Sequence, residues 1–208
     1  YERAKDCRHV AYELVMLPFP PRVQQRDYLQ VNPLGTVPAF FDGATRMTES
    51  VAISQYLVTR YGPSPLAVAL DEDDYGPWLN WQYFGEATLT FPQTLVLRYS
   101  VMEPPERRNP SVAEDYAKWF LARLRGIDAI VATQDWLCAG RFTTADISVG
   151  YALLLATCLG LHTRFTPAVT AYHARLQARD GYQRAVAAEQ RAAQAQGVAF
   201  DLASFIAG

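Results

Sequence analysis

The chain has 208 residues, of which 50% are apolar and 19% are charged, so it is long enough for one large domain or two small ones without disulfide or metal staples. Its 19 Lys and Arg residues nearly balance its 21 Asp and Glu residues, which gives a formal net charge of -2. A nucleic-acid-binding chain ordinarily carries a basic excess that releases phosphate counterions. We therefore expect no nucleic-acid partner.

Hydropathy and cysteine usage both predict a cytoplasmic chain. The longest charge-free run, residues 147–163, is shorter than the roughly 20 apolar residues that a spanning helix needs. We therefore interpret it as a buried core helix and expect no membrane association. The three cysteines, Cys7, Cys138 and Cys158, are odd in number and lack short spacing. We therefore expect no disulfide framework and a reducing compartment.

Strand and turn patterns dominate the first 62 residues. The apolar run 11–17 between charged residues and prolines predicts a buried strand, and residues 32–35 (NPLG) have turn chemistry. A hairpin is predicted over residues 37–47, because Asp42-Gly43 supplies the positive φ of a tight turn. A helix is expected to start at Thr48-Glu49-Ser50 and to end before Gly62-Pro63.

Helical patterns dominate the remainder. The sequence predicts a domain over residues 1–62, a Pro-bearing and acidic linker over 63–74, and an all-helical domain over 75–208. The predicted helices are 78–98 with a bend at Pro92, a segment opened by Asn109-Pro110, the charge-free run behind a Thr143–Asp146 capping pattern, 167–177, and 183–195.

One constellation indicates a ligand site: Val37-Pro38 at a strand entrance, followed after ten residues by Glu49-Ser50 at a helix start. A cis peptide bond is accessible before proline, and it would turn the Val37 amide and carbonyl outward to pair with an extended peptide. The helix start offers a hydroxyl and amide N–H groups to a carboxylate. In the alternative interpretation, Ser50 is only an N-cap and Pro38 only a strand-entry proline.

Self-contained catalytic and metal motifs are not found. The sequence has no G-x-S-x-G, Walker or G-x-G-x-x-G motif. His9, His162 and His173 are isolated, so we expect surface or capping roles for them and no metal site. Cys138 and Cys158 are predicted to be core residues.

Four segments in order resemble a known family: N-P-L-G-T-V-P (32–38), E-S-V-A-I-S-Q-Y-L (49–57), F-T-T-A-D-I-S (142–148) and the stretch 167–185. Together they are similar to the cytosolic-type, bacterial-like glutathione S-transferase family. The resemblance implies a thioredoxin-like α/β N-terminal domain, an all-α C-terminal domain and assembly as a homodimer.

The resemblance also assigns roles to single residues. It implies that Val37 binds the cysteinyl backbone of glutathione beside a cis Pro38, and that Glu49 and Ser50 hold its γ-glutamyl end. Asp146, with the Thr143 before it, corresponds to the folding N-cap of the family's central helix. Glutathione is the implied co-substrate, and no metal is implied.

The resemblance breaks at the start of the chain. Ala4 to Tyr12 matches the end of the family's first helix, so the first strand, the thiol-activating loop and most of that helix are expected upstream of Tyr1. The catalytic residue is therefore unknown, and Tyr1 does not correspond to the catalytic tyrosine of the family.

The implied activity is that of a transferase that conjugates the glutathione thiolate to a small hydrophobic electrophile, as in detoxification. A glutathione-dependent lyase, reductase or isomerase, or a non-catalytic protein-binding module, are the alternatives. Aromatic residues could line the electrophile site or belong to the core: Trp81, Tyr83, Phe84, Phe91 and Tyr99.

Overall fold

The computed structural model describes residues 10–198, which form two compact units. The first unit contains residues 10–67 and 183–198, and the second contains residues 68–182. Tyr1, Cys7 and His9, and most of the segment matched to the family's first helix, lie outside the described residues. Each unit is described by itself below.

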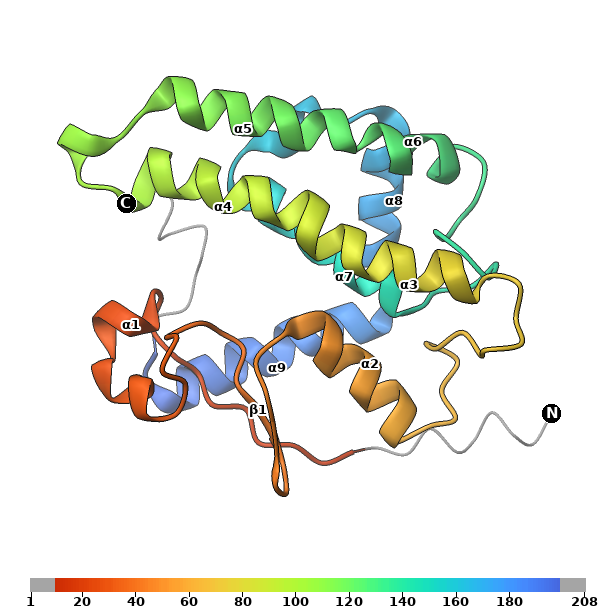
Figure 1. The fold of residues 1–208 in the computed structure, drawn as a ribbon, viewed down its shortest axis with the longest axis horizontal. Helices are drawn as coiled ribbons and strands as arrows, with labels where there is room; N and C mark the ends of the chain where they lie inside the picture. Colours follow the sequence, from red (N-terminus) through yellow and green to blue (C-terminus); the bar gives the residue numbers. More distant parts are fainter. Residues whose placement is uncertain (1–9, 199–208) are drawn as a thin grey trace. The chain divides into compact units, whose positions relative to one another are not determined.

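Short elements build the first unit (Figure 1). They are α1 (Pro21–Gln24), the 3-10 turn η2 (Arg26–Gln30), the strands β1 (Phe40–Asp42) and β2 (Thr45–Met47), α2 (Ser50–Arg60) and most of α9 (Asp180–Gln196). The two strands are antiparallel with Phe40 opposite Met47 and Asp42 opposite Thr45. Gly43 in the turn has φ +57°, so the predicted hairpin is confirmed, with shorter strands.

The predicted strand over residues 11–17 is wrong. This segment has no ladder partner, and the sheet found among residues 10–198 contains only β1 and β2. The Met16 side chain is buried, whereas Tyr12 is 72% and Val15 is 65% exposed. The Gln196 amide of α9 donates to the Leu14 carbonyl and accepts from the Met16 N–H. An apolar run becomes a strand only where a neighbouring strand pairs with it.

Helices alone build the second unit. In chain order they are α3 (Tyr75–Tyr83), the π-helical η3 (Phe84–Thr90), α4 (Phe91–Leu97), the π-helical η4 (Arg98–Met102), η5 (Pro105–Arg107), α5 (Pro110–Arg123), α6 (Arg125–Val131), α7 (Thr144–Cys158), η6 (Leu161–Arg164) and α8 (Pro167–Gln177). In Figure 1, α5 lies alongside α4. The predicted helix 167–177 is confirmed at both ends.

The helical run around Pro92, where a bend is predicted, includes two stretches of π-helix. Pro92 lies in the first turn of α4, where its missing N–H matters least, and the irregular segments are η3 and η4 on either side. Gly85 in η3 lies against the backbone of α7: a Cβ built there would be 2.6 Å from the Ser148 carbonyl carbon and 2.8 Å from the Val149 nitrogen. Only glycine allows this approach.

Helix α7 is the centre of the second unit's core, as expected for the charge-free run. Its residues Val149, Ala152 and Leu153 are fully buried together with Phe120 and Tyr172. The predicted capping box is present, because the Thr143 hydroxyl accepts from the Ala145 N–H and the Asp146 carboxylate accepts from the Thr143 N–H at 2.8 Å.

Asp146 does more than cap its own helix. Its side chain is fully buried, and its Oδ1 accepts from the Leu137 N–H at 3.1 Å and from the Tyr172 hydroxyl at 2.7 Å. Burial raises the pKa of Asp146, and these hydrogen bonds oppose that shift. The carboxylate therefore joins the start of α7 to the preceding loop and to α8.

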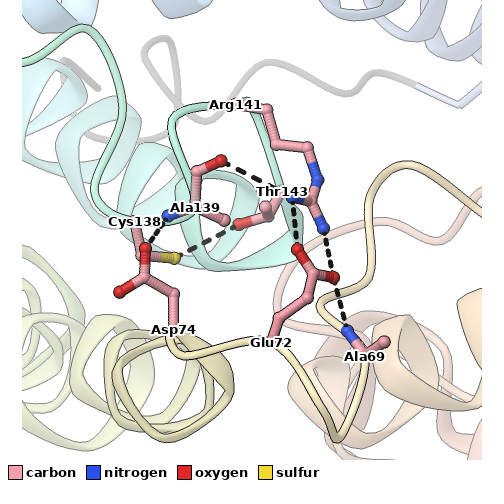
Figure 2. Close-up of polar contacts among 7 residues, drawn as sticks. All are labelled: Ala69, Glu72, Asp74, Cys138, Ala139, Arg141 and Thr143. Atoms are coloured by element: carbon pink, nitrogen blue, oxygen red, sulfur yellow. Dashed lines mark hydrogen bonds and ion pairs between the residues drawn. The ribbon is translucent and has the colours of Figure 1, made fainter.

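A polar latch ties the start of the second unit to the loop before α7 (Figure 2). Arg141 binds the Glu72 carboxylate with both terminal nitrogens, each at 2.7 Å, and the Ala139 N–H donates to Asp74 at 2.5 Å. Ala139 has φ +56°, a left-handed conformation that an alanine rarely adopts. The latch, Glu72, Asp74, Ala139 and Arg141, lies wholly within this unit.

Candidate functional site

The hairpin brings the four predicted site residues to one end of the β1–β2 ribbon. Val37 and Pro38 precede β1, and Glu49 and Ser50 follow β2. Because Phe40 pairs with Met47 at the open end of the hairpin, the two dipeptides leave the ribbon from adjacent strands. All four residues are exposed.

Val37 presents main-chain groups that peptide-like ligands bind. The Val37-Pro38 bond is cis, as predicted, and within residues 10–198 neither the N–H nor the C=O of Val37 has a hydrogen-bond partner. The preceding carbonyl, that of Thr36, is held by the Tyr28 hydroxyl at 2.6 Å and the Asn32 amide at 2.8 Å. The loop is thus fixed up to the residue before the exposed groups.

The predicted turn over residues 32–35 supplies this support. Its Gly35 N–H donates to the Asn32 carbonyl at 2.8 Å, and Gly35 has φ +63°. Asn32 is buried and its amide reaches forward to Thr36. The role of Tyr28 was not predictable, because no local pattern indicates that its hydroxyl reaches eight residues along the chain.

Ser50 is the first residue of α2, and Glu49 holds the N-cap position without a side-chain capping bond. The interpretation of Ser50 as only an N-cap is therefore wrong. The Glu49 carbonyl accepts from the Ile53 N–H, and its carboxylate accepts from the Thr48 hydroxyl at 3.1 Å. Amide groups in a helix's first turn attract anions.

The geometry allows one kind of chemistry. A main-chain donor and acceptor at Val37 suit an extended peptide backbone, while the positive end of α2 beside Ser50 suits a carboxylate. None of the four residues is a nucleophile with a neighbouring base. The groups at these four residues suit the binding of a small acidic peptide.

The aromatic residues considered for the second substrate divide into two sets. Trp81 and Phe84 are half-buried and pack against the core of the second unit, with ring centroids 5.0 Å apart. Tyr83 and Phe91 are each 53% exposed, and Tyr99 is half-buried. Aromatic residues at helical spacing do not reveal which face they occupy until the partner helices are placed.

Cys138 and His173 are both buried in the second unit. Burial raises the pKa of the Cys138 thiol to about 11, which leaves it protonated and unreactive. His173 is buried rather than on the surface or at a cap, which corrects the prediction, and burial lowers its pKa. In the described part of the chain, no group of three or more His, Cys, Asp or Glu could hold a metal ion.

Comparison with known proteins identifies the fold. Residues 2–65 match the family described as glutathione S-transferase, N-terminal domain. The glutathione transferase URE2P6 from Phanerochaete chrysosporium, solved in complex with oxidized glutathione, superposes with a TM-score of 0.75 at 27% identity, covering 88% of this chain and 86% of that one. The architecture is a thioredoxin-like N-terminal domain followed by an all-helical domain.

Curated relatives agree with the structural match. Glutathione S-transferase GstA of Escherichia coli O157:H7 is 29% identical over 164 residues, covering 78% of each chain. Glutathione S-transferase 3 of Zea mays is 28% identical over 175 residues, covering 79% of this chain and 77% of the relative. The chain is thus similar to glutathione S-transferases over most of its length, and the family match itself covers residues 2–65.

Within residues 10–198, no helix is both long and apolar enough to cross a membrane.

Proposed function

We propose that the protein is a glutathione transferase that joins the sulfur of glutathione to a small hydrophobic electrophile. The observation that carries the proposal is the pair of unpartnered main-chain groups at Val37 beside the start of α2 at Ser50. Glutathione has both features that this pair would recognise, an extended peptide backbone and an acidic γ-glutamyl end.

The proposed contacts divide the tripeptide between two elements. The Val37 N–H donates to, and its C=O accepts from, the cysteinyl residue, with Pro38 shaping the loop. The γ-glutamyl carboxylate accepts from the Ser50 hydroxyl and first-turn N–H groups, while Glu49 faces the γ-glutamyl amine. The bound thiolate attacks an electrophilic carbon, a C–S bond forms, the leaving group departs with its electron pair, and the thiol proton passes to solvent.

No residue is proposed as the thiol activator. The family relationship supports assembly as a homodimer, a cytoplasmic location and a role in detoxification. The predicted domain limits, 1–62 and 75–208 with a linker over 63–74, remain part of the proposal, with the difference that residues 183–198 fall in the first compact unit.

Calorimetric titration with glutathione tests the binding step. Ser50→Ala should weaken glutathione binding by about 1 to 3 kcal/mol, the scale of a hydrogen bond to a charged group, with little change in stability because Ser50 is exposed. Ser54→Ala, which removes the same hydroxyl one turn further along α2, is the matched control and should bind normally.

Conjugation is tested separately, by thiol consumption in the presence of an activated aryl halide. Retention on immobilised glutathione with thiol consumption supports the transferase. Glutathione binding without conjugation favours the non-catalytic alternative. A protein that neither binds glutathione nor consumes it contradicts the proposal.

A further inference from the structure

A carboxylate at the turn end of the hairpin is held by two phenols from α2. The Asp42 Oδ2 accepts from the Tyr56 hydroxyl at 2.8 Å and from the Tyr61 hydroxyl at 2.7 Å. The Tyr56 ring also meets the Phe40 ring edge-on, with centroids 5.9 Å apart. Asp42, Tyr56 and Tyr61 are called the hairpin clamp below.

The clamp and the candidate site lie at opposite ends of the same ribbon. The site residues leave the hairpin beyond the Phe40–Met47 pair, whereas Asp42 pairs with Thr45 beside the turn. Helix α2 starts at Ser50 and ends at Arg60, with Tyr61 as its C-cap, so it rises about 16 Å along its axis. The helix therefore runs from the site end of the hairpin to its turn end.

Two attachments thus set the angle between the hairpin and α2. One is the covalent link through Thr48 and Glu49 at the site end, and the other is the clamp at the turn end. If the clamp is removed, α2 can pivot about the link, and the direction of its first-turn N–H groups relative to Val37 changes. A helix held at both ends cannot make this movement.

Packing alone gives this part of the chain little resistance to such a pivot. The buried apolar residues of the hairpin and α2 are only Val51, Ile53 and Val58, all on the helix. The strands contribute half-buried or exposed side chains. With so little buried area on the strand side, hydrogen bonds carry more of the orientation than they do in a large core.

The clamp also has a defined protonation state. The hydrogen bond from Tyr61 is the main reason that the pKa of Asp42 is lowered, and the Arg60 charge acts in the same direction. The same bond is the main reason that the pKa of Tyr61 is raised. Asp42 is thus the acceptor and Tyr61 the donor across the neutral range.

We propose that Asp42 is a positioning residue for the glutathione site, and that the hairpin clamp sets glutathione affinity without touching the ligand. The inference rests on the proposed function, because it assumes that Val37 and Ser50 bind one ligand together. It adds three residues that no local sequence pattern marks.

Titration calorimetry with glutathione tests the proposal on the whole chain. Asp42→Ala should weaken glutathione binding about 2- to 30-fold, the range for residues that act on a site they do not contact. Tyr61→Phe should weaken it less, and should have no further effect in the Asp42→Ala background, because the same bond has already been lost. Asp42→Asn keeps one acceptor oxygen and should recover part of the affinity.

A matched control separates positioning from general loss of stability. Val58→Ala removes buried side-chain volume from the same helix and leaves the clamp intact, so it should lower stability with glutathione affinity unchanged. In steady-state kinetics the clamp variants should raise KM for glutathione and leave kcat and KM for the electrophile unchanged.

The outcomes distinguish this inference from the proposed function. If the unsubstituted protein binds glutathione and Asp42→Ala binds it equally well, the clamp does not position the site. Equal losses in Val58→Ala and Asp42→Ala would also overturn the inference, because stability alone would explain them. If the unsubstituted protein does not bind glutathione, the proposed function fails and this inference fails with it.

Discussion

The two units are stabilised by different interactions. The second unit buries a continuous cluster of apolar residues from α4 to α8 around α7. The first unit buries few apolar side chains, Met16, Tyr28, Val51, Ile53, Val58 and Ala193. The Thr36 carbonyl, the Asp42 carboxylate and the Gln196 side-chain amide each make two hydrogen bonds that hold its segments together. Substitutions in the second unit should therefore change stability, whereas substitutions at the polar contacts and exposed site residues of the first unit should mainly change ligand affinity.

The proposed ligand residues fit this division. Val37 and Ser50 are exposed residues of the lightly packed unit, where they can be replaced without opening a cavity. The buried carboxylate of the second unit, Asp146, has all its hydrogen bonds within the protein. If the two units differ in this way, substitutions in the second unit should lower the free energy of unfolding and leave glutathione affinity unchanged.

Asp146→Ala should have the largest effect. It leaves the Leu137 and Thr143 N–H groups and the Tyr172 hydroxyl without their acceptor in a buried place. The expected loss is about 3 to 5 kcal/mol of the free energy of unfolding, since each buried unpaired donor costs about 1 to 3 kcal/mol and a lost cap adds to it. Urea denaturation followed by circular dichroism measures this loss.

Tyr172→Phe is the graded control for that variant, because it removes only one of the donors. Its loss should be about 1 to 2 kcal/mol, the scale of one hydrogen bond to a charged acceptor. A folded Asp146→Ala protein with weakened glutathione binding would contradict this difference between the units, because the helical unit would then affect ligand affinity.

The close approach of η3 to α7 predicts an intermediate effect. Gly85→Ala places a Cβ within 2.6 Å of the Ser148 carbonyl carbon, so one of the two helices must shift. The expected loss is about 1 to 3 kcal/mol, the usual cost of overpacking a close-packed interior. The midpoint of thermal unfolding should fall accordingly.

A second glycine in the same helical run sharpens this test. A Cβ at Gly76 in α3 would meet nothing within 4 Å, so Gly76→Ala should stabilise the protein by about 0.5 to 1 kcal/mol through helix propensity. Equal effects at both positions would show that helix propensity rather than the close approach governs Gly85.

Some of this contrast between the units could be predicted from sequence. Local signals succeeded: the capping pattern at Thr143, the turn at Gly35, the hairpin at Gly43 and the helix start at Pro167 all depend on neighbouring residues. They define most helices of the second unit and the loops that carry Val37 and Ser50. The family resemblance added the thioredoxin-like fold.

Long-range pairing was the part that failed. The run over residues 11–17 has strand composition but no partner strand. The packing of Trp81 and Phe84 against the core of the second unit likewise depends on residues far along the chain. The hairpin clamp was missed for the same reason, because Asp42 and Tyr61 are brought together by the angle between the hairpin and α2.

The polar latch predicts the smallest effect, and its sign depends on pH. The two bonds from Arg141 are the main reason that the pKa of Glu72 falls from 4.5 to about 2. A carboxylate whose pKa is lowered by folding stabilises the protein above its unfolded pKa and loses that contribution as the pH falls through its folded pKa. The stabilisation by Glu72 should therefore be complete above pH 4.5 and vanish by about pH 2.

The free energy of unfolding of the unsubstituted protein is compared with that of Glu72→Gln across this pH range. Asp146 titrates in both proteins, so its effect cancels and the difference gives the contribution of Glu72. The difference should be positive at neutral pH and shrink towards acid, and it should be reduced by salt because both side chains are partly exposed. Asp115→Asn, which removes an exposed carboxylate from α5, controls for the change in net charge. A constant difference would mean that the latch is held by the Asp74–Ala139 bond rather than by the ion pair.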